Sequence, residues 1–141
     1  MIVNGRRAFV GSDAGRAQRA IAEALEHPGS VTLSAGVSPV TDEGVLLVSY
    51  AAPELPPDAV VHLAVVERGR SQRVTRGENT GQTLDHENVV RVFETLAGRF
   101  GKAPLAVPEA LNLANASLVA CAQDPKTMAV LGATRLDLEA E

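Results

Sequence analysis

The pattern of apolar and polar residues changes its period once along the chain. Over residues 13–26 apolar side chains recur every three or four positions, which predicts an amphipathic helix; they are Ala17, Ala20, Ile21, Ala24 and Leu25. Ser12 or Asp13 can cap the start of this helix, and the His-Pro-Gly sequence at 27–29 ends it. From Ser30 onward the period is two, which predicts β-strands.

Short β-prone runs separated by turn signals fill the rest of the chain. The runs are VTLSAGV, VLLVSY, AVVHLAVVE, SQRVTR, VVRVFETLA, PLAVP, SLVACAQ and MAVLGATRL. Arg68-Gly69-Arg70 is interpreted as a hairpin turn between the third and fourth runs, and residues 124–127 as a turn with proline at its second position. Near the N-terminus, Asn4-Gly5 between two β-prone runs predicts a tight hairpin.

Two segments allow two interpretations each. Residues 89–100 fit a helical stripe or a strand, and their β-branched content favours the strand. Residues 109–115 fit a short helical turn or a loop. Together the elements predict a mainly β fold, α+β overall: a β-hairpin and one helix over residues 1–28, then an antiparallel β-sandwich of about seven or eight strands over residues 30–141.

Composition and charge exclude several classes of function. The 141 residues, 45% hydrophobic and 21% charged, suit one globular domain or a domain with an appendage. Aromatic residues make up only 3%, and the net charge is −4, so a nucleic-acid partner is not expected. No apolar run is long enough to span a bilayer and no signal-peptide pattern is visible, so a membrane partner is not expected either.

The single cysteine, Cys121, excludes an intrachain disulfide and a Cys-x-x-Cys redox pair. It lies in the alternating run SLVACAQ, without a neighbouring cation or helix start. We therefore interpret it as a buried, inert thiol, and we expect no cofactor.

One polar stretch, RGENTGQTLDHENVVR at residues 76–91, stands out from the apolar background. Its candidate site residues are Arg76, Glu78, Asn79, His86, Asn88 and Arg91. The stretch has one histidine, and His27 and His62 lie at no recognised ligand spacing, so no metal site is predicted. The chain has no Gly-x-Ser-x-Gly motif, and Gly77 and Gly81 are not followed by the Lys-Ser/Thr of a phosphate loop, so no catalytic residue is predicted.

The favoured interpretation of this stretch is a structural loop tied to the sandwich by its polar groups. Asn79 and Asn88 can satisfy backbone groups, and Glu78 can pair with Arg91 or Arg76. Strand alternation would place His86 and Asn88 on one face. A ligand-binding or protein-binding role for the same loop stays open.

Three stretches together resemble the C-terminal portion of a bacterial family of predicted secreted, thioredoxin-like proteins, domain of unknown function 1223. They are MIVNGRRAFVGSD with the helix after it, RGENTGQTLDHENVVR, and the final VLGATRL. The most specific matches are Arg76 through Asn79, Gly81, Thr83-Leu84, His86 and Asn88 through Arg91. The resemblance implies that residues 1–28 correspond to the last hairpin and helix of a thioredoxin fold and that the protein is periplasmic or secreted; the chain itself does not indicate a compartment.

The chain departs from this family at one decisive place. Family members carry a Cys-x-x-Cys pair early in the thioredoxin-like domain, and this chain begins after that position. The redox chemistry of the family therefore attaches to no residue here, and enzymatic activity is not expected of this chain. The resemblance implies a fragment, a natural short version, or a gene whose start was placed late.

A hairpin and one helix do not bury their apolar faces alone. The side chains concerned are Ile2, Phe9, Val10, Ile21 and Leu25, and each would lose about 1.5–3 kcal/mol of favourable burial in water. We expect residues 1–28 to pack on the β-rich module or, preferably, to pair with another copy of themselves.

The functional hypothesis is a noncatalytic β-sandwich module that acts by self-association, as a homo-oligomer, or by association with a thioredoxin-like half. One alternative is an accessory or substrate-positioning part of an extracytoplasmic thiol-disulfide oxidoreductase. A second alternative is a sandwich that binds a small ligand.

Overall fold

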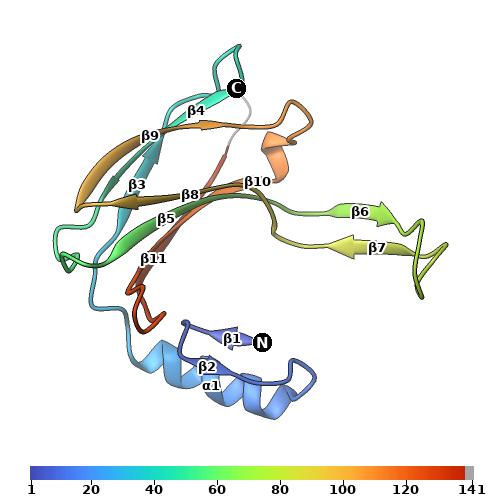
Figure 1. The fold of residues 1–141 in the computed structure, drawn as a ribbon, viewed down its shortest axis with the longest axis horizontal. Coiled ribbons are helices and arrows are strands. Elements are labelled where there is room, and N and C mark those ends of the chain that lie inside the picture. Colours follow the sequence, from blue (N-terminus) through green and yellow to red (C-terminus); the bar gives the residue numbers. More distant parts are fainter. Residues whose placement is uncertain (139–141) are drawn as a thin grey trace.

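The fold, which a computed structural model describes over residues 1–138, is mainly β with one α-helix. These residues form eleven strands, and every strand pairing is antiparallel. The mainly β, antiparallel class expected from the sequence is therefore confirmed (Figure 1). The sheets of the described residues do not close into a barrel.

Two sheets form the β module. The four-stranded sheet has the order β11 (Val130–Asp137), β10 (Ala116–Gln123), β5 (Val60–Glu67), β8 (Val89–Ala97). The three-stranded sheet has the order β3 (Ser34–Val37), β4 (Val45–Ala51), β9 (Phe100–Ala106). Residues 89–97, for which the sequence allowed either a helix or a strand, form a strand, as favoured. Residues 109–115 include the short 3-10 helix η1 (Leu113–Asn115).

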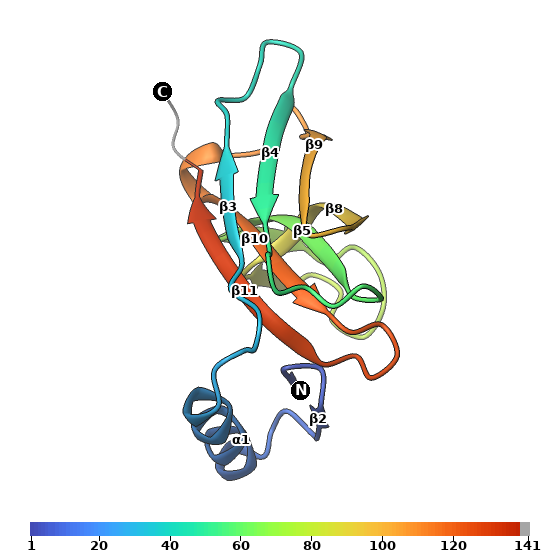
Figure 2. The ribbon, with the colours of Figure 1, turned by 90° about the vertical axis from the view of Figure 1, so that its left-hand side faces the viewer.

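Both sheets, whose arrangement is shown in Figure 2, contribute side chains to one aliphatic core. Alternate residues of β5, β10 and β4 point into it: Val61, Leu63, Val65, Leu118, Ala120, Ala122, Leu46, Val48 and Tyr50. The hydroxyl of Tyr50 donates to the carbonyl oxygens of Ala97 and Gly98, at 3.2 and 3.1 Å, and burial raises the pKa of this phenol. The core therefore satisfies the polar end of its aromatic side chain.

The prediction of a hairpin turn at Arg68-Gly69-Arg70 is wrong. β5 continues past Gly69 into β6 (Arg70–Arg73), which pairs with β7 (Thr83–His86), and β7 leads into β8. β5 with β6, and β7 with β8, thus form one long two-stranded ribbon. Its outer part, residues 68–88, extends away from the four-stranded sheet and is called the arm (Figure 1). In the sequence, Gly69 suggests a turn. In the structure its positive φ of 65° lies at the junction where the arm leaves the sheet.

The N-terminal lobe, residues 1–28, contains β1 (Ile2–Val3), β2 (Arg7–Ala8) and α1 (Ala14–Glu26). Asn4 and Gly5 have φ of 48° and 68°, as a tight hairpin with two left-handed turn residues requires, so this hairpin is confirmed. Asp13 caps α1 by accepting a hydrogen bond from the amide of Arg16 at 2.9 Å. Of the two expected caps, Asp13 is therefore the one used.

The lobe is joined to the β module at the turn between β10 and β11. The amide of Val130 donates to the carbonyl oxygen of Asn4, and the amide of Val31 donates to that of Leu131, both at 3.0 Å. A Cβ on Gly5 would overlap the carbonyl oxygen of Met128. The lobe therefore sits at one end of the module (Figures 1 and 2).

Candidate functional site

Residues 76–88 of the polar motif form the tip and the return strand of the arm, and residues 89–91 begin β8. β6 is exposed along its whole length, and β7 is exposed except at Leu84. Gly77 and Gly81 have φ of 91° and 90° and turn the chain at the tip, where the amide of Gly81 donates to the carbonyl oxygen of Val74 at 2.8 Å. The tip is thus held by its own backbone and not by the β module.

The structure does not bring the six candidate residues together. The side chains of five of them make no hydrogen bond or ion pair with any residue in the range 1–138; they are Arg76, Glu78, Asn79, His86 and Asn88. The expected pairing of Glu78 with Arg91 or Arg76 is wrong, because Arg91 pairs with Glu67. The sequence does not record which carboxylate lies beside Arg91 in the folded chain.

Glu67, Arg91 and Arg70 form a charged clamp at the base of the arm. Glu67 is only 3% exposed and Arg91 15%, and the Arg91 guanidinium donates to Oε2 of Glu67. Oε1 of Glu67 accepts from the amide of Asn112 at 3.2 Å, and the Arg70 guanidinium lies 3.8 Å from Oε2. The clamp therefore ties the arm to the segment before β10, and the only sequence signal for it is a charged residue closing the apolar run AVVHLAVVE.

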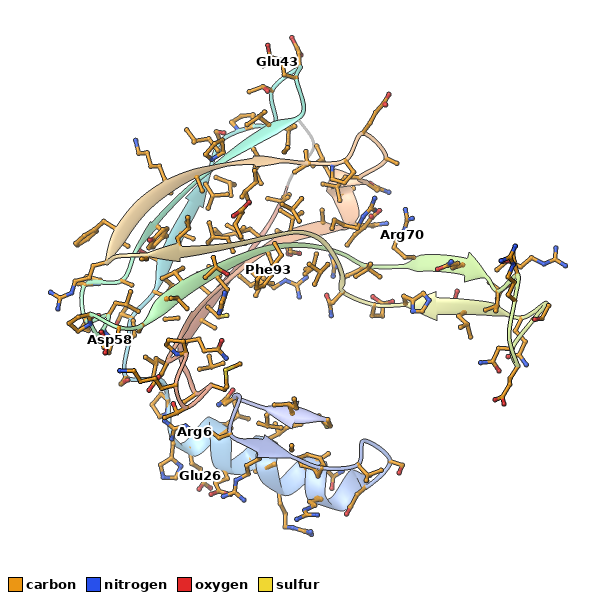
Figure 3. The ribbon with its side chains drawn as sticks, in the orientation of Figure 1. Arg6, Glu26, Glu43, Asp58, Arg70 and Phe93 are labelled. Carbon is orange, nitrogen blue, oxygen red and sulfur yellow. The ribbon has the colours of Figure 1, made fainter. Side chains whose placement is uncertain are left out.

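A second cluster, missed in the sequence, surrounds His62 on the outer face of the four-stranded sheet. Nδ1 of His62 lies 2.9 Å from Oγ1 of Thr95, and Nε2 lies 2.9 Å from Oε1 of Gln123. The ring stacks on Phe93 with centroids 5.2 Å apart, on the side of the sheet toward the N-terminal lobe (Figure 3). Both ring nitrogens are engaged, so this histidine has neither nitrogen open for a metal or a substrate proton.

Cys121 lies beside His62 in the strand register of β10 and β5. It is half-buried, not buried as expected, because its side chain faces the outside of the sheet. Burial nonetheless raises the pKa of the Cys121 thiol, which keeps it protonated at neutral pH. The site is therefore a poor place for a thiolate nucleophile.

Residues 1–138 contain neither a metal-binding cluster nor a membrane-spanning helix. Within this range no three His, Cys, Asp or Glu side chains gather in a group that could hold a metal ion. In the same part of the chain, α1 falls short of the length and apolar character needed to cross a bilayer.

Large apolar side chains are exposed on the N-terminal lobe. Ile2 is 70% exposed, Val10 73%, Leu25 79% and Ile21 42%, whereas Phe9 is half-buried. The β module therefore leaves Ile2, Val10, Ile21 and Leu25 uncovered, and packing on the module, the less favoured of the two expectations, is wrong for these four residues. In α1 the fully buried residue is Ala20, because the hairpin packs close to the alanine side of the helix and turns Ile21 and Leu25 outward.

A cavity of about 370 Å³ lies between the hairpin and α1 and is rich in arginine. Its lining consists of Arg6, Arg7, Ala8, Phe9, Arg16, Arg19 and Ala20. A second cavity of about 390 Å³ shares Arg6, Arg7 and Ala20 with it and continues toward the start of β11. Sequence reasoning missed both cavities, although the pair Arg6-Arg7 and the i, i+3 pair Arg16 and Arg19 were visible signals.

Comparison with known proteins yields one match. A family model described as "Protein of unknown function (DUF1223)" matches residues 1–129. No curated protein and no solved structure matches the chain.

Proposed function

The chain belongs to the DUF1223 family of proteins of unknown function, and from this premise we propose that it is a noncatalytic β module that works by association through its N-terminal lobe. The partner is a second copy of the chain or a thioredoxin-like half whose missing part the lobe completes. The proposal includes the likeness of the lobe to the last hairpin and helix of a thioredoxin fold, and with it a periplasmic or secreted location.

The observation that carries the proposal is the exposed apolar surface of the lobe. Ile2, Val10 and Leu25 each leave at least seven-tenths of their surface in solvent. Burying a side chain of this kind is worth about 1.5–3 kcal/mol, so covering the three together favours docking. A two-stranded hairpin with one helix is also marginally stable alone, and a partner would stabilise it.

Two features of the β module support a noncatalytic role. The ring nitrogens of His62 are both engaged with Thr95 and Gln123, and burial holds the Cys121 thiol in its protonated form. The histidine of the arm, His86, stands exposed on an isolated ribbon without a partner among residues 1–138. General acid-base chemistry requires a histidine with a nitrogen open to the substrate and a positioned partner group. His62 has no open nitrogen, and His86 has no partner among residues 1–138.

The test is the mass of the protein in solution as a function of concentration, measured by light scattering during gel filtration. We expect a concentration-dependent dimer that dissociates in the double variant Val10→Glu/Leu25→Glu, because a dimer interface does not accept unpaired charges. The matched control, Leu47→Glu/Val90→Glu, changes two exposed apolar residues of the β module and should leave the dimer intact.

Two results would count against the proposal. One is a dimer that persists unchanged in the lobe variant. The other is a monomer at every concentration that also fails to bind a separately expressed thioredoxin-like domain, where the DNA upstream of Met1 encodes one. A Cys-x-x-Cys in that upstream frame, with binding, would favour the accessory role in a thiol-disulfide oxidoreductase.

A further inference from the structure

The cavity between the hairpin and α1 gathers positive charge from two elements, and we refer to it as the arginine pocket. Arg6 and Arg7 come from the hairpin, and Arg16 and Arg19 from the first half of α1. Figure 3 places Arg6 at the end of the lobe nearest the β module. Four of the seven lining residues are therefore arginines that the fold brings together from positions up to thirteen residues apart.

Three of these guanidinium groups have no partner in the described part of the chain. Arg7 pairs with Glu23 at 2.5 Å. The side chains of Arg6, Arg16 and Arg19 form no hydrogen bond or ion pair with residues 1–138. Asp13, close by in the sequence, uses its carboxylate to cap α1.

The local charge opposes that of the whole protein. The chain carries a net charge of −4, yet the arginine pocket carries four positive charges against the single carboxylate of Glu23. Like charges that line one cavity repel each other, and solvent moderates the repulsion here because the four arginines are exposed. A bound anion removes this repulsion.

We propose that the arginine pocket binds the phosphate group of a phosphorylated small molecule. A guanidinium donates two parallel hydrogen bonds to a phosphate, and this geometry is the reason arginine is selected at phosphate sites. A phosphate monoester offers three acceptor oxygens and a charge of about −1.5 to −2 at neutral pH, which suits three free guanidinium groups better than one carboxylate does.

The adjoining cavity supplies room for the organic part of the ligand. It shares Arg6, Arg7 and Ala20 with the arginine pocket and is also lined by His27, Val130 and Leu131. The two cavities thus meet along the hairpin, charged at one end and mixed polar and apolar at the other. None of the residues Ile2, Val10 and Leu25, which carry the proposed association, lines either cavity.

The experiment is calorimetric titration of the full chain at constant ionic strength, so that general screening is the same for every probe. The probes are inorganic phosphate, ribose 5-phosphate, ribose, an unphosphorylated Asp/Glu peptide and vesicles containing phosphatidic acid. We expect both small phosphates to bind, ribose 5-phosphate more tightly, and ribose not to bind.

The double variant Arg16→Gln/Arg19→Gln should weaken phosphate binding by about tenfold or more, because it removes two of the three unpartnered guanidinium groups that can donate charge-assisted hydrogen bonds to the phosphate. The matched control Arg73→Gln/Arg76→Gln removes the same charge from the exposed arm and should bind as the parent does. Circular dichroism checks that α1 persists, and the single variant Arg6→Gln, outside the helix, gives a second test.

Three outcomes would overturn the inference: no binding of either small phosphate, equal weakening in the pocket variant and the arm variant, or binding of the peptide or the vesicles alone. None of these outcomes depends on the mass of the protein in solution. Failure of phosphate binding and failure of lobe association are therefore separate results.

Discussion

At the scale of single residues, Glu67 shows how one buried carboxylate is stabilised. It is nearly inaccessible, and it receives the Arg91 guanidinium and the Asn112 amide. A buried carboxylate is tolerated only when such partners replace the lost water. The same contacts place Arg91, the last candidate residue of the polar motif, in a structural role.

We predict that Glu67→Ala destabilises the protein by about 3 kcal/mol, since it leaves Arg91 largely buried and unpaired. The free energy of unfolding from chemical denaturation measures the effect. The control is Asp58→Ala, which breaks the pair of Asp58 with Lys126, whose side chains are 75% and 74% exposed, and should cost less than about 1 kcal/mol. Equal losses of unfolding free energy in the two variants would show that the buried Glu67–Arg91 pair stabilises the protein no more than the exposed Asp58–Lys126 pair does.

At the scale of elements, the N-terminal hairpin depends on a glycine for two reasons. Gly5 has a positive φ of 68°, and its α-carbon lies against the backbone of Met128 in the turn between β10 and β11. Gly69, at the base of the arm, has a similar φ of 65° but open space around it. Substitution of Gly69 therefore tests the effect of the left-handed backbone alone, whereas substitution of Gly5 tests that effect together with the close packing.

We predict that Gly69→Ala costs about 1 kcal/mol from the left-handed backbone alone, whereas Gly5→Ala costs more, because the added methyl also displaces the lobe from the module. Hydrogen exchange of the Val130 amide, which donates to Asn4, reports this displacement directly. Exchange of that amide should accelerate in Gly5→Ala and stay unchanged in Gly69→Ala. Identical behaviour of the two variants would mean that the lobe does not rest on this contact.

At the scale of the whole molecule, the lobe and the β module differ in how they are stabilised. The buried core cluster runs from Val31 to Leu138 and includes no residue of the lobe. The lobe itself fully buries only Ala20 among its apolar side chains. The β module therefore holds its own core, whereas the lobe depends on its junction with the module.

We predict that a chain lacking residues 1–28 still folds, because its core is complete, and unfolds in one cooperative transition. Far-ultraviolet circular dichroism and thermal denaturation measure this. The truncated chain should also lose both the proposed dimer and the proposed phosphate binding. A truncated chain without a cooperative transition would show that the lobe is part of the same folding unit.

The local elements were predictable because their causes lie within a few residues. The Asn4-Gly5 turn, the Asp13 cap and the strands of the β module each follow from turn chemistry, capping or a period of two. The candidate site was predicted less well. The sequence marked residues 76–91 as distinctive, but it did not show that residues 76–88 belong to an arm and that Arg91, in β8, pairs with Glu67.

The sequence by itself determined the fold class, the antiparallel pairing and the position of the helix, since periodicity and turn residues act locally. The tertiary structure decided which face of α1 is exposed, that β5 and β6 are collinear and not a hairpin, and that four arginines meet in one pocket. These features depend on contacts between distant segments. The sequence pattern within one element does not indicate at which small side chain a second element packs closely, or which charged side chains the packing brings together.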